Sequence, residues 1–336
     1  MTELLTVNSL SVGFTSNDRT LPVVRDLSFT VNRGETLVIV GESGSGKSVT
    51  CLALMGLLPR PAGRVLNGEI RLVRKNGSAC DIAQLDQDGM QGVRGAEIAM
   101  IFQEPMTSLN PVYTVGYQII EAIRFHEHTS PRAARARALE MLALLGIPDP
   151  GSRLDSYPHQ LSGGMRQRAM IGMALACRPA LLIADEQTTA LDVTVQAQIL
   201  DLLRRLQREL GMAMIFITHN LGVAGEIADR VLVMYAGQCV EAAPRAAAFA
   251  SPRHPYTMGL MRAVPRLGVD RTSGPLATIP GNVPDLAHLP TGCAFHPRCD
   301  FRLPALCDVR EPSLEPCGDA HLVHCLRWRE IAGAAA

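Results

Sequence analysis

The sequence predicts an α/β protein in which buried strands carry a phosphate-binding loop. An apolar run at residues 37–40 leads into a glycine-rich turn and then into a helix-forming run at residues 51–57, which is the setting in which such loops occur. Short runs that are wholly or almost wholly apolar, at residues 98–102, 181–184 and 214–218, are typical of buried strands in parallel sheets. Helical periodicity between these runs completes the α/β pattern.

The glycine-rich turn fits the pattern G-x-x-x-x-G-K-[ST] at every position. Its residues are Gly41, Glu42, Ser43, Gly44, Ser45, Gly46, Lys47 and Ser48, and Val49 follows as part of the expected nucleotide site. The glycines let successive N–H groups point at a phosphate chain, and the next helix adds the positive end of its dipole. Lys47 would reach the β- and γ-phosphates, and Ser48 would bind Mg²⁺. We therefore expect a nucleoside triphosphate here.

Length and charge narrow the class of protein. The chain has 336 residues, of which 47% are apolar, enough for a large domain and a smaller one. Its 32 basic residues balance 32 acidic ones, so no overall positive field favours nucleic acid. The N-terminus lacks the features of a leader, and no apolar run has the length of a membrane span. We expect a cytoplasmic protein that does not bind nucleic acid.

The N-terminal part is expected to form an antiparallel layer ahead of the loop. Residues 4–14 and 24–31 alternate apolar and polar side chains, as strands do. Phe14, at the end of the first strand, could stack on an adenine ring or pack into the core, and both readings stay open. Residues 68–74 predict another strand, and the polar residues 75–95 an exposed loop.

A helical subdomain is expected at about residues 109–178, inserted between strands of the nucleotide-binding domain. Near its end, Ser162, Gly163 and Gly164 precede a helix that runs to Cys177. Exposed N–H groups at such a helix start could bind a second anion, although an ordinary helix cap with flexible glycines explains the same residues.

Polar side chains follow three of the buried strands, at the edge where such sheets bind ligands. Gln103 could sense the γ-phosphate through Mg²⁺ or water. Asp185 would hold Mg²⁺ through water, and Glu186 would polarise the attacking water. His219 could touch the transferring group, although a single histidine is more often structural. Asp192 follows in a turn, ahead of an amphipathic helix at residues 193–210.

The order of these motifs resembles the ATP-binding cassette (ABC) family over residues 4–241. The resemblance implies an ABC-type P-loop ATPase with a RecA-like core. It also implies a head-to-tail dimer holding two ATP molecules, in which the helix start at Ser162 contacts the ATP of the second cassette. Gln103 and its loop would meet a membrane subunit, and Asp192 would link the two sites.

Several segments look more specifically like the ATPases of oligopeptide, dipeptide and nickel importers. These segments are residues 41–48, 102–111, 161–168, 188–200, 254–257 and 281–325. The resemblance implies a related second ATPase subunit, two transmembrane permease subunits and an extracytoplasmic solute-binding protein, with this chain peripheral on the cytoplasmic face of the inner membrane. Peptides are the expected cargo, with nickel or another small solute as the alternative. Gln187 and Asn220 depart from the usual proline and aspartate.

Two other classes of ATPase compete with the importer subunit. Soluble ABC clamps that act on chromosomes or ribosomes typically carry a long coiled coil or tandem cassettes, and this chain has neither. A binding-only subunit with a degenerate site is the second alternative. The intact Asp185, Glu186 and His219 argue against it.

The sequence divides at about residue 250 into a nucleotide-binding domain, residues 1–250, and a cysteine-rich extension, residues 251–336. Residues 252–289 are rich in proline and predict an extended arm. Five of the nine cysteines follow, at Cys293, Cys299, Cys307, Cys317 and Cys325. Four thiolates suit a [4Fe-4S] cluster or structural zinc, and a short segment with little apolar content would need such a cross-link.

The spacing of the cysteines lacks the Cys-x-x-Cys pairs that zinc sites favour. The importer resemblance implies a [4Fe-4S] cluster held by Cys293, Cys299, Cys307 and Cys325. Seven residues separate Cys299 from Cys307 where the resemblance leads us to expect six, so Cys317 could substitute as the third ligand. Zinc stays open as the alternative.

Overall fold

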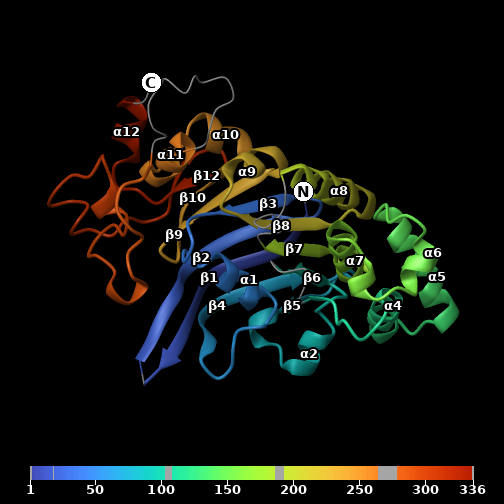
Figure 1. Cartoon of the computed structure of the whole chain (residues 1–336). Helices are drawn as coiled ribbons and strands as arrows, with labels where there is room; N and C mark the ends of the chain where they lie inside the picture. Colours follow the sequence, from blue (N-terminus) through green and yellow to red (C-terminus); the bar gives the residue numbers. More distant parts are fainter. Residues whose placement is uncertain (1, 18, 103–107, 186–192, 264–277, 335–336) are drawn as a thin grey trace. The chain divides into compact units, whose positions relative to one another are not determined.

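The computed structural model describes the chain except for residues 1, 18, 103–107, 186–192, 264–277 and 335–336 (Figure 1). Strands and helices alternate along most of it, which confirms the predicted α/β class. The chain forms two compact units. The first comprises Met1–Leu5, Thr30–Glu35 and Arg71–Phe216, and the second Thr6–Phe29, Thr36–Ile70 and Ile217–Ala336. None of the helices within these described residues is long and apolar enough to cross a membrane.

The predicted N-terminal layer is a four-stranded sheet with the order β2-β1-β4-β5. Its strands are β1 (Glu3–Ser16), β2 (Arg19–Asn32), β4 (Gly63–Val73) and β5 (Ala79–Asp81). The prediction of a plain loop at residues 75–95 was wrong, because β5, the 3-10 turn η1 (Ile82–Gln84) and α2 (Gln87–Gln91) lie within it. Side-chain caps start both turns: Asp81 accepts a hydrogen bond from Ala83 N–H, and Asp86 accepts one from Gly89 N–H.

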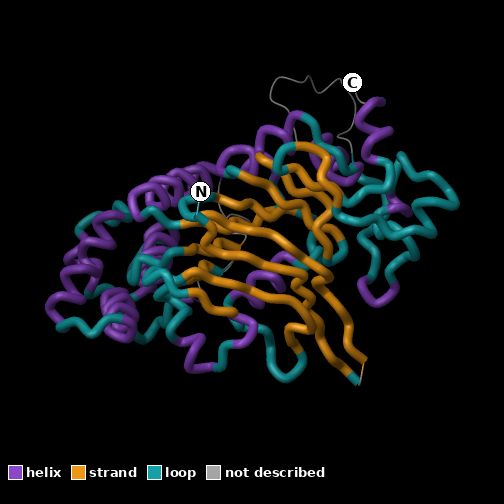
Figure 2. The backbone as a smooth tube through the Cα atoms, turned by 180° about the vertical axis from the view of Figure 1, so that it is seen from behind, coloured by secondary structure: helices purple, strands orange, loops and turns teal. Residues whose placement is uncertain are grey.

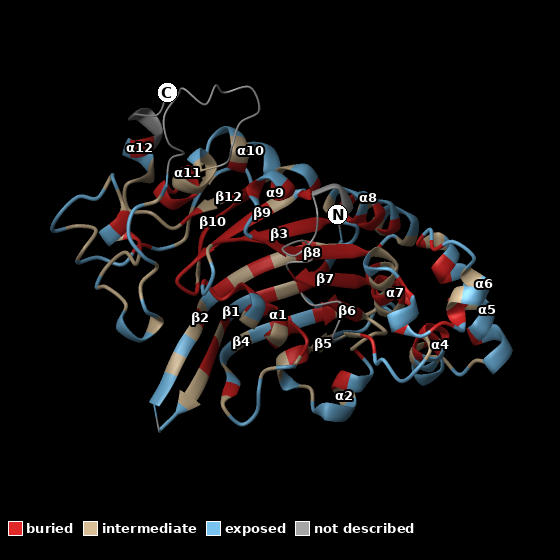
Figure 3. Cartoon of the chain, viewed as in Figure 1, coloured by how far each residue is buried: buried red, intermediate tan, exposed pale blue. Residues whose placement is uncertain are grey.

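In the first unit the apolar runs form strands β6 (Ile98–Ile101) and β7 (Leu181–Asp185), followed by β8 (Ala213–Thr218), which extends just past the unit. β6 pairs in parallel with β7, with Ile98 opposite Leu181. Every residue of the three strands is buried (Figure 3). The sequence-based interpretation of these runs as buried strands is therefore confirmed, and the parallel pairing of the first two agrees with it.

Beyond residue 109, the other elements of this unit are helical. They are α4 (Val115–His126), α5 (Pro131–Leu144), α6 (Pro150–Leu154), the 3-10 turn η2 (Pro158–Gln160), α7 (Gly163–Leu175) and α8 (Val193–Leu210). Ser130 caps α5 by accepting a hydrogen bond from Ala133 N–H, and Pro131 occupies the first turn. Because proline lacks the N–H that would be unpaired there anyway, it suits that position.

The second unit contains a sheet with the strand order β11-β12-β10-β9-β3; Figure 2 draws its strands in orange. Its strands are β3 (Thr36–Val40), β9 (Arg230–Tyr235), β10 (Gln238–Pro244), β11 (Glu315–Gly318) and β12 (His321–Val323). β3 runs parallel to β9, whereas β10 pairs antiparallel with both β9 and β12. The cysteine-rich end of the chain therefore adds two strands to this sheet.

Apart from the parts of β1, β2 and β4 that it contains, the other elements of this unit are helical. They are α1 (Lys47–Leu54), α9 (Leu221–Ile227), α10 (Arg245–Ala250), α11 (Pro255–Arg262), η4 (Leu286–His288), η5 (His296–Arg298) and α12 (Trp328–Ala334). The predicted extended arm at residues 252–289 was wrong where α11 forms. Pro255 stands in the first turn of this helix and His254 caps it, Nδ1 accepting a hydrogen bond from Tyr256 N–H, so the proline starts the helix rather than preventing it.

A buried carboxylate ties the C-terminal region to the sheet. Glu241 on β10 is fully buried and accepts hydrogen bonds from Arg253 N–H at 2.7 Å and His254 N–H at 2.9 Å. His321 on β12 lies with Nε2 2.7 Å from the same carboxylate. Since an unpaired buried charge is costly, these partners are needed to keep Glu241 inside.

The buried His254 should make stability depend on pH. Burial, with a smaller contribution from nearby His324, lowers its pKa from 6.5 to about 4, against the opposing effect of Glu241. As the pH falls below about 6.5, the unfolded chain gains a proton that the folded chain refuses, so the free energy of unfolding decreases until about pH 4. The loss between pH 7 and pH 5 should be about 2 kcal/mol.

The melting temperature at pH 7 and pH 5 checks this expectation. His254→Asn is the control, because an amide oxygen can still accept the hydrogen bond of Tyr256 N–H but does not titrate. The variant should lose less stability on acidification than the parent chain. Equal losses in both proteins would assign the pH dependence to other groups.

Candidate nucleotide-binding site

The glycine-rich loop joins β3 to α1, as the sequence predicts. Gly44 and Gly46 have φ values of 79° and 99°, a region that side chains with a Cβ rarely enter. A Cβ on Gly41 would lie 2.3 Å from the carbonyl oxygen of Met234. The glycines therefore permit both the loop's conformation and its close approach to β9.

Lys47, the first residue of α1, extends back into the loop. Only 5% of the residue is exposed. Its Nζ donates hydrogen bonds to the carbonyl oxygens of Gly41 at 2.8 Å and Glu42 at 2.9 Å. Ser45 is buried, Ser43 and Ser48 are exposed, and Val49 is partly buried. The ammonium group thus lies inside the loop, beside residues that remain open to solvent.

Two other predicted site residues lie in the same unit. Phe14 on β1 is partly buried, and its Cε1 atom is 3.0 Å from the position of a Cβ on Gly63. His219 follows β8 and is exposed. Asn220, the departure from aspartate, accepts hydrogen bonds from Gly222 N–H and Val223 N–H at the start of α9. Its amide oxygen does the capping that a carboxylate would do.

The first unit carries the remaining predicted positions. Asp185 is the last residue of β7 and is 8% exposed. Ser162 caps α7, its hydroxyl oxygen accepting a hydrogen bond from Met165 N–H at 3.3 Å, as the helix-cap reading expects. A Cβ on Gly163 or Gly164 would meet no atom within 4 Å, so packing inside the chain does not require glycine there. Gln103, Glu186, Gln187 and Asp192 lie outside the described residues.

Four of the five C-terminal cysteines line one cavity. They are Cys293, Cys299, Cys307 and Cys325. Burial, with smaller contributions from the neighbouring thiols, raises the pKa of the Cys299 thiol to about 11 and that of the Cys325 thiol to about 12. Cys317 lies on β11, and nearby Glu241 adds to the upward shift that burial gives its pKa. Its expected role as a substitute ligand has no support in this arrangement.

The donor set of this cavity fits a thiolate-held centre in kind and number. Across the described parts of the chain, however, no three or more histidine, cysteine, aspartate or glutamate side chains are arranged to hold a metal ion. The described structure thus brings four thiols to one cavity but does not show the metal-holding arrangement that the expected [4Fe-4S] cluster or its zinc alternative requires.

Sequence reasoning missed a set of residues that surround the loop. Arg298 pairs with Glu42, and the Tyr256 hydroxyl accepts a hydrogen bond from Glu42 N–H. Glu42 occupies a variable position of the loop pattern, and Arg298 directly precedes Cys299. No local pattern relates the two, because 256 positions separate them in the sequence.

Together, the strand, glycine loop and lysine-bearing helix define a P-loop nucleotide-binding protein of the α/β class. Residues 24–189 match the family described as ABC transporter, and residues 240–307 match the C-terminal region of oligopeptide/dipeptide transporters. The chain belongs to the family of ABC transporter ATP-binding proteins, which are ATPases.

Relatives align over almost the whole chain. A protein of Brucella melitensis, named as a peptide import ATP-binding protein, is 55% identical over 98% of both chains. The dipeptide transport ATP-binding protein DppD of Bacillus subtilis is 50% identical, over 97% of this chain and 95% of its own. DppD of Escherichia coli is also 50% identical, over 96% of both chains.

Solved structures agree with this family. The ATP-binding cassette MJ0796, a dimer bound to ADP and Pi in a post-hydrolysis state, superposes with a TM-score of 0.62. It is 26% identical and covers 72% of this chain and 99% of its own. The cbiO1 protein from Clostridium perfringens, part of the transporter complex cbiONQ, gives a TM-score of 0.63 at 26% identity, over 74% of this chain and 92% of its own.

Proposed function

We propose that this chain is the ATP-hydrolysing subunit of a transporter that imports di- or oligopeptides. The observation that carries the proposal is the match of both parts of the chain, the cassette and the region after residue 240, to peptide-import ATPases. Its partners are a related ATPase subunit, two transmembrane permease subunits and an extracytoplasmic solute-binding protein. The chain binds the permease at the cytoplasmic face of the inner membrane, with residues 1–250 as the nucleotide-binding domain and residues 251–336 as its extension.

The proposed chemistry assigns each site residue a task. Lys47 and the N–H groups of the loop hold the phosphates of ATP. Mg²⁺, when bound, neutralises phosphate charge, and Ser48, Gln103 and Asp185 would hold it. Glu186 orients the attacking water and His219 contacts the transferring phosphoryl group, while Phe14 stacks on the adenine. The buried position of Lys47 among loop carbonyls supports this assignment.

The ATP site is completed by a second cassette in this proposal. Ser162, Gly163 and Gly164 contact the ATP held by the partner subunit, and Asp192 links the two sites. The open space beside both glycines supports it, because a backbone without side chains lets a phosphate approach the N–H groups of a helix start closely.

Purification of the intact complex from membranes tests the proposal. The chain should co-purify with two membrane proteins and a second ATPase, and the complex reconstituted with its solute-binding protein should take up labelled dipeptide only when ATP is inside the vesicle. Uptake of Ni²⁺ without uptake of peptide would show that the transported solute is nickel and not a peptide. Purification without any membrane protein would overturn the transporter assignment.

The same preparation tests a thiol-held centre in the extension, proposed at Cys293, Cys299, Cys307 and Cys325. The support is their convergence on one cavity. Protein purified without oxygen should be brown and contain iron and acid-labile sulfide. A colourless protein with stoichiometric zinc would show that the centre holds zinc and not an iron-sulfur cluster. A protein with neither iron nor zinc would contradict the proposed centre.

A further inference from the structure

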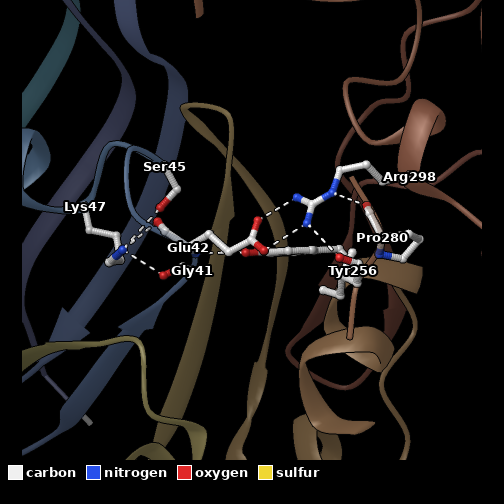
Figure 4. A network of polar contacts seen from close by, with 8 residues as sticks. Gly41, Glu42, Ser45, Lys47, Tyr256, Pro280 and Arg298 are labelled. Atoms are coloured by element: carbon white, nitrogen blue, oxygen red, sulfur yellow. Dashed lines mark hydrogen bonds and ion pairs between the residues drawn. The ribbon is translucent and has the colours of Figure 1, made fainter. Parts of the chain in front are cut away.

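Two residues of the C-terminal region, Arg298 and Tyr256, contact the phosphate loop at Glu42 (Figure 4). The guanidinium group of Arg298 donates hydrogen bonds to both carboxylate oxygens, at 2.6 Å and 3.0 Å. The backbone N–H of Glu42 donates to the Tyr256 hydroxyl at 2.9 Å. On its other side, the Glu42 carbonyl accepts from Lys47 Nζ. One loop residue thus joins the phosphate-binding lysine to two residues that follow the cassette.

Other contacts fix the side chain of Arg298, so its pairing with Glu42 can fix the position of the loop. Its side chain is 5% exposed. Nε donates a hydrogen bond to the carbonyl oxygen of Pro280 at 2.9 Å, and the guanidinium carbon lies 5.8 Å from the centre of the Tyr235 ring. Such a distance allows a cation–π interaction. The guanidinium group of Arg298 is therefore already ordered, and pairing with Glu42 costs little side-chain conformational entropy.

The segment that carries Arg298 is anchored in the interior of the C-terminal region by an aromatic residue. Phe295, three residues before Arg298, is 3% exposed. Its ring packs against those of Tyr235 and Tyr256, with ring centres 5.2 Å and 5.4 Å apart. The residue after Arg298 is Cys299, which lines the cysteine cavity. Arg298 thus lies in a short stretch of chain, residues 295–299, that contributes both to the aromatic cluster and to the cavity lined by the four thiols.

We propose that Arg298 is a positioning residue for ATP binding, which acts through Glu42. By pairing with the carboxylate, it fixes the start of the loop and cancels a negative charge next to the phosphate-binding site. The C-terminal region thereby sets the affinity of the loop for ATP. This inference rests on the proposed role of the loop in binding ATP.

Two physical effects support a measurable change in affinity. A glycine-rich loop released from its anchor spends less time in the conformation that binds phosphate, and the apparent dissociation constant rises in proportion. A carboxylate left unpaired also repels the phosphates of ATP. We expect Arg298→Ala to raise KM and the dissociation constant for ATP about five- to thirty-fold, with a smaller change in kcat, because the hydrolytic groups stay in place.

The experiment measures ATP binding to the full-length chain and KM and kcat of the assembled complex. Arg298→Lys keeps the charge but not the fork, so its affinity should lie between those of the parent and Arg298→Ala. Glu42→Gln in the Arg298→Ala background should recover part of the affinity, because it removes the bare charge. Arg302→Ala, an exposed arginine of the same segment, is the matched control and should bind ATP as the parent does.

The readouts separate positioning from mere stability. If Arg298→Ala and Arg298→Lys melt earlier but bind ATP with the parent's affinity, Arg298 is only structural and the proposal is overturned. Failure of the double variant to recover affinity would overturn the charge-cancelling part. Lys47→Ala separates failure of the Arg298 proposal from failure of the proposed role of the loop. If this variant too leaves ATP binding unchanged, the loop is not the ATP-binding site.

Discussion

Replacing Glu186 with glutamine is expected to reduce ATP hydrolysis by the assembled complex about 10²- to 10⁴-fold while ATP still binds. The amide keeps the size of the side chain but cannot accept the proton of the attacking water. The phosphate loop, with Lys47 in it, is unchanged by this substitution. Nucleotide should therefore accumulate in the complex as unhydrolysed ATP.

Phosphate release by the purified complex and the nucleotide extracted from it are the two measurements. Asp201→Asn makes the same change of carboxylate to amide on α8, where 75% of the side chain is exposed, and should hydrolyse ATP at the parent rate. Parent-like phosphate release by Glu186→Gln would remove the residue from catalysis.

Replacing Lys47 with alanine should weaken ATP binding itself. The substitution deletes a charged donor that reaches into the loop, and a hydrogen bond of a charged group typically contributes enough for a loss of about ten- to a hundred-fold in affinity. It also removes the hydrogen bonds that Nζ gives to the carbonyls of Gly41 and Glu42. The variant should therefore lose the lysine's contact with ATP and the hydrogen bonds that stabilise the conformation of the loop.

A binding titration with ATP and Mg²⁺ measures this effect. The chain has only one other lysine, Lys75, whose Nζ donates to the carbonyl oxygens of Cys177 and Arg178 just beyond α7. Lys75→Ala is therefore the matched control, with stability as its expected loss and ATP affinity unchanged. Equal ATP affinity of Lys47→Ala and the parent would contradict the phosphate-loop assignment.

Features encoded by neighbouring residues could be predicted well from the sequence. The bounds expected for the helix at residues 193–210 are those of α8, and the runs at residues 98–102, 181–184 and 214–218 form most of β6, β7 and β8. Periodicity and apolar runs determine such elements because their cause lies within a few positions. The loop at Gly41 is local in the same sense, since its glycines, lysine and following helix are contiguous.

Short-range capping was harder to predict, and it accounts for the errors. Residues 75–95 and 252–289 look like loops by composition, yet Asp81, Asp86 and His254 each accept a backbone hydrogen bond and start a turn or helix. By composition, the prolines of residues 252–289, Pro255 among them, favour an extended chain. The place of Pro255 in the first turn of α11 reverses that meaning.

The sequence by itself therefore determined the class of the protein and the glycine-rich loop between β3 and α1, because a P-loop is built from one short segment. Only the tertiary structure decided what surrounds that segment. Glu42 meets Arg298 across 256 positions of the chain, and Glu241 lies buried among the backbone of His254 and the ring of His321. Such pairs depend on strand order and register, since each side chain alone would remain in water, and the energy of bringing both inside is recovered only when the fold joins them.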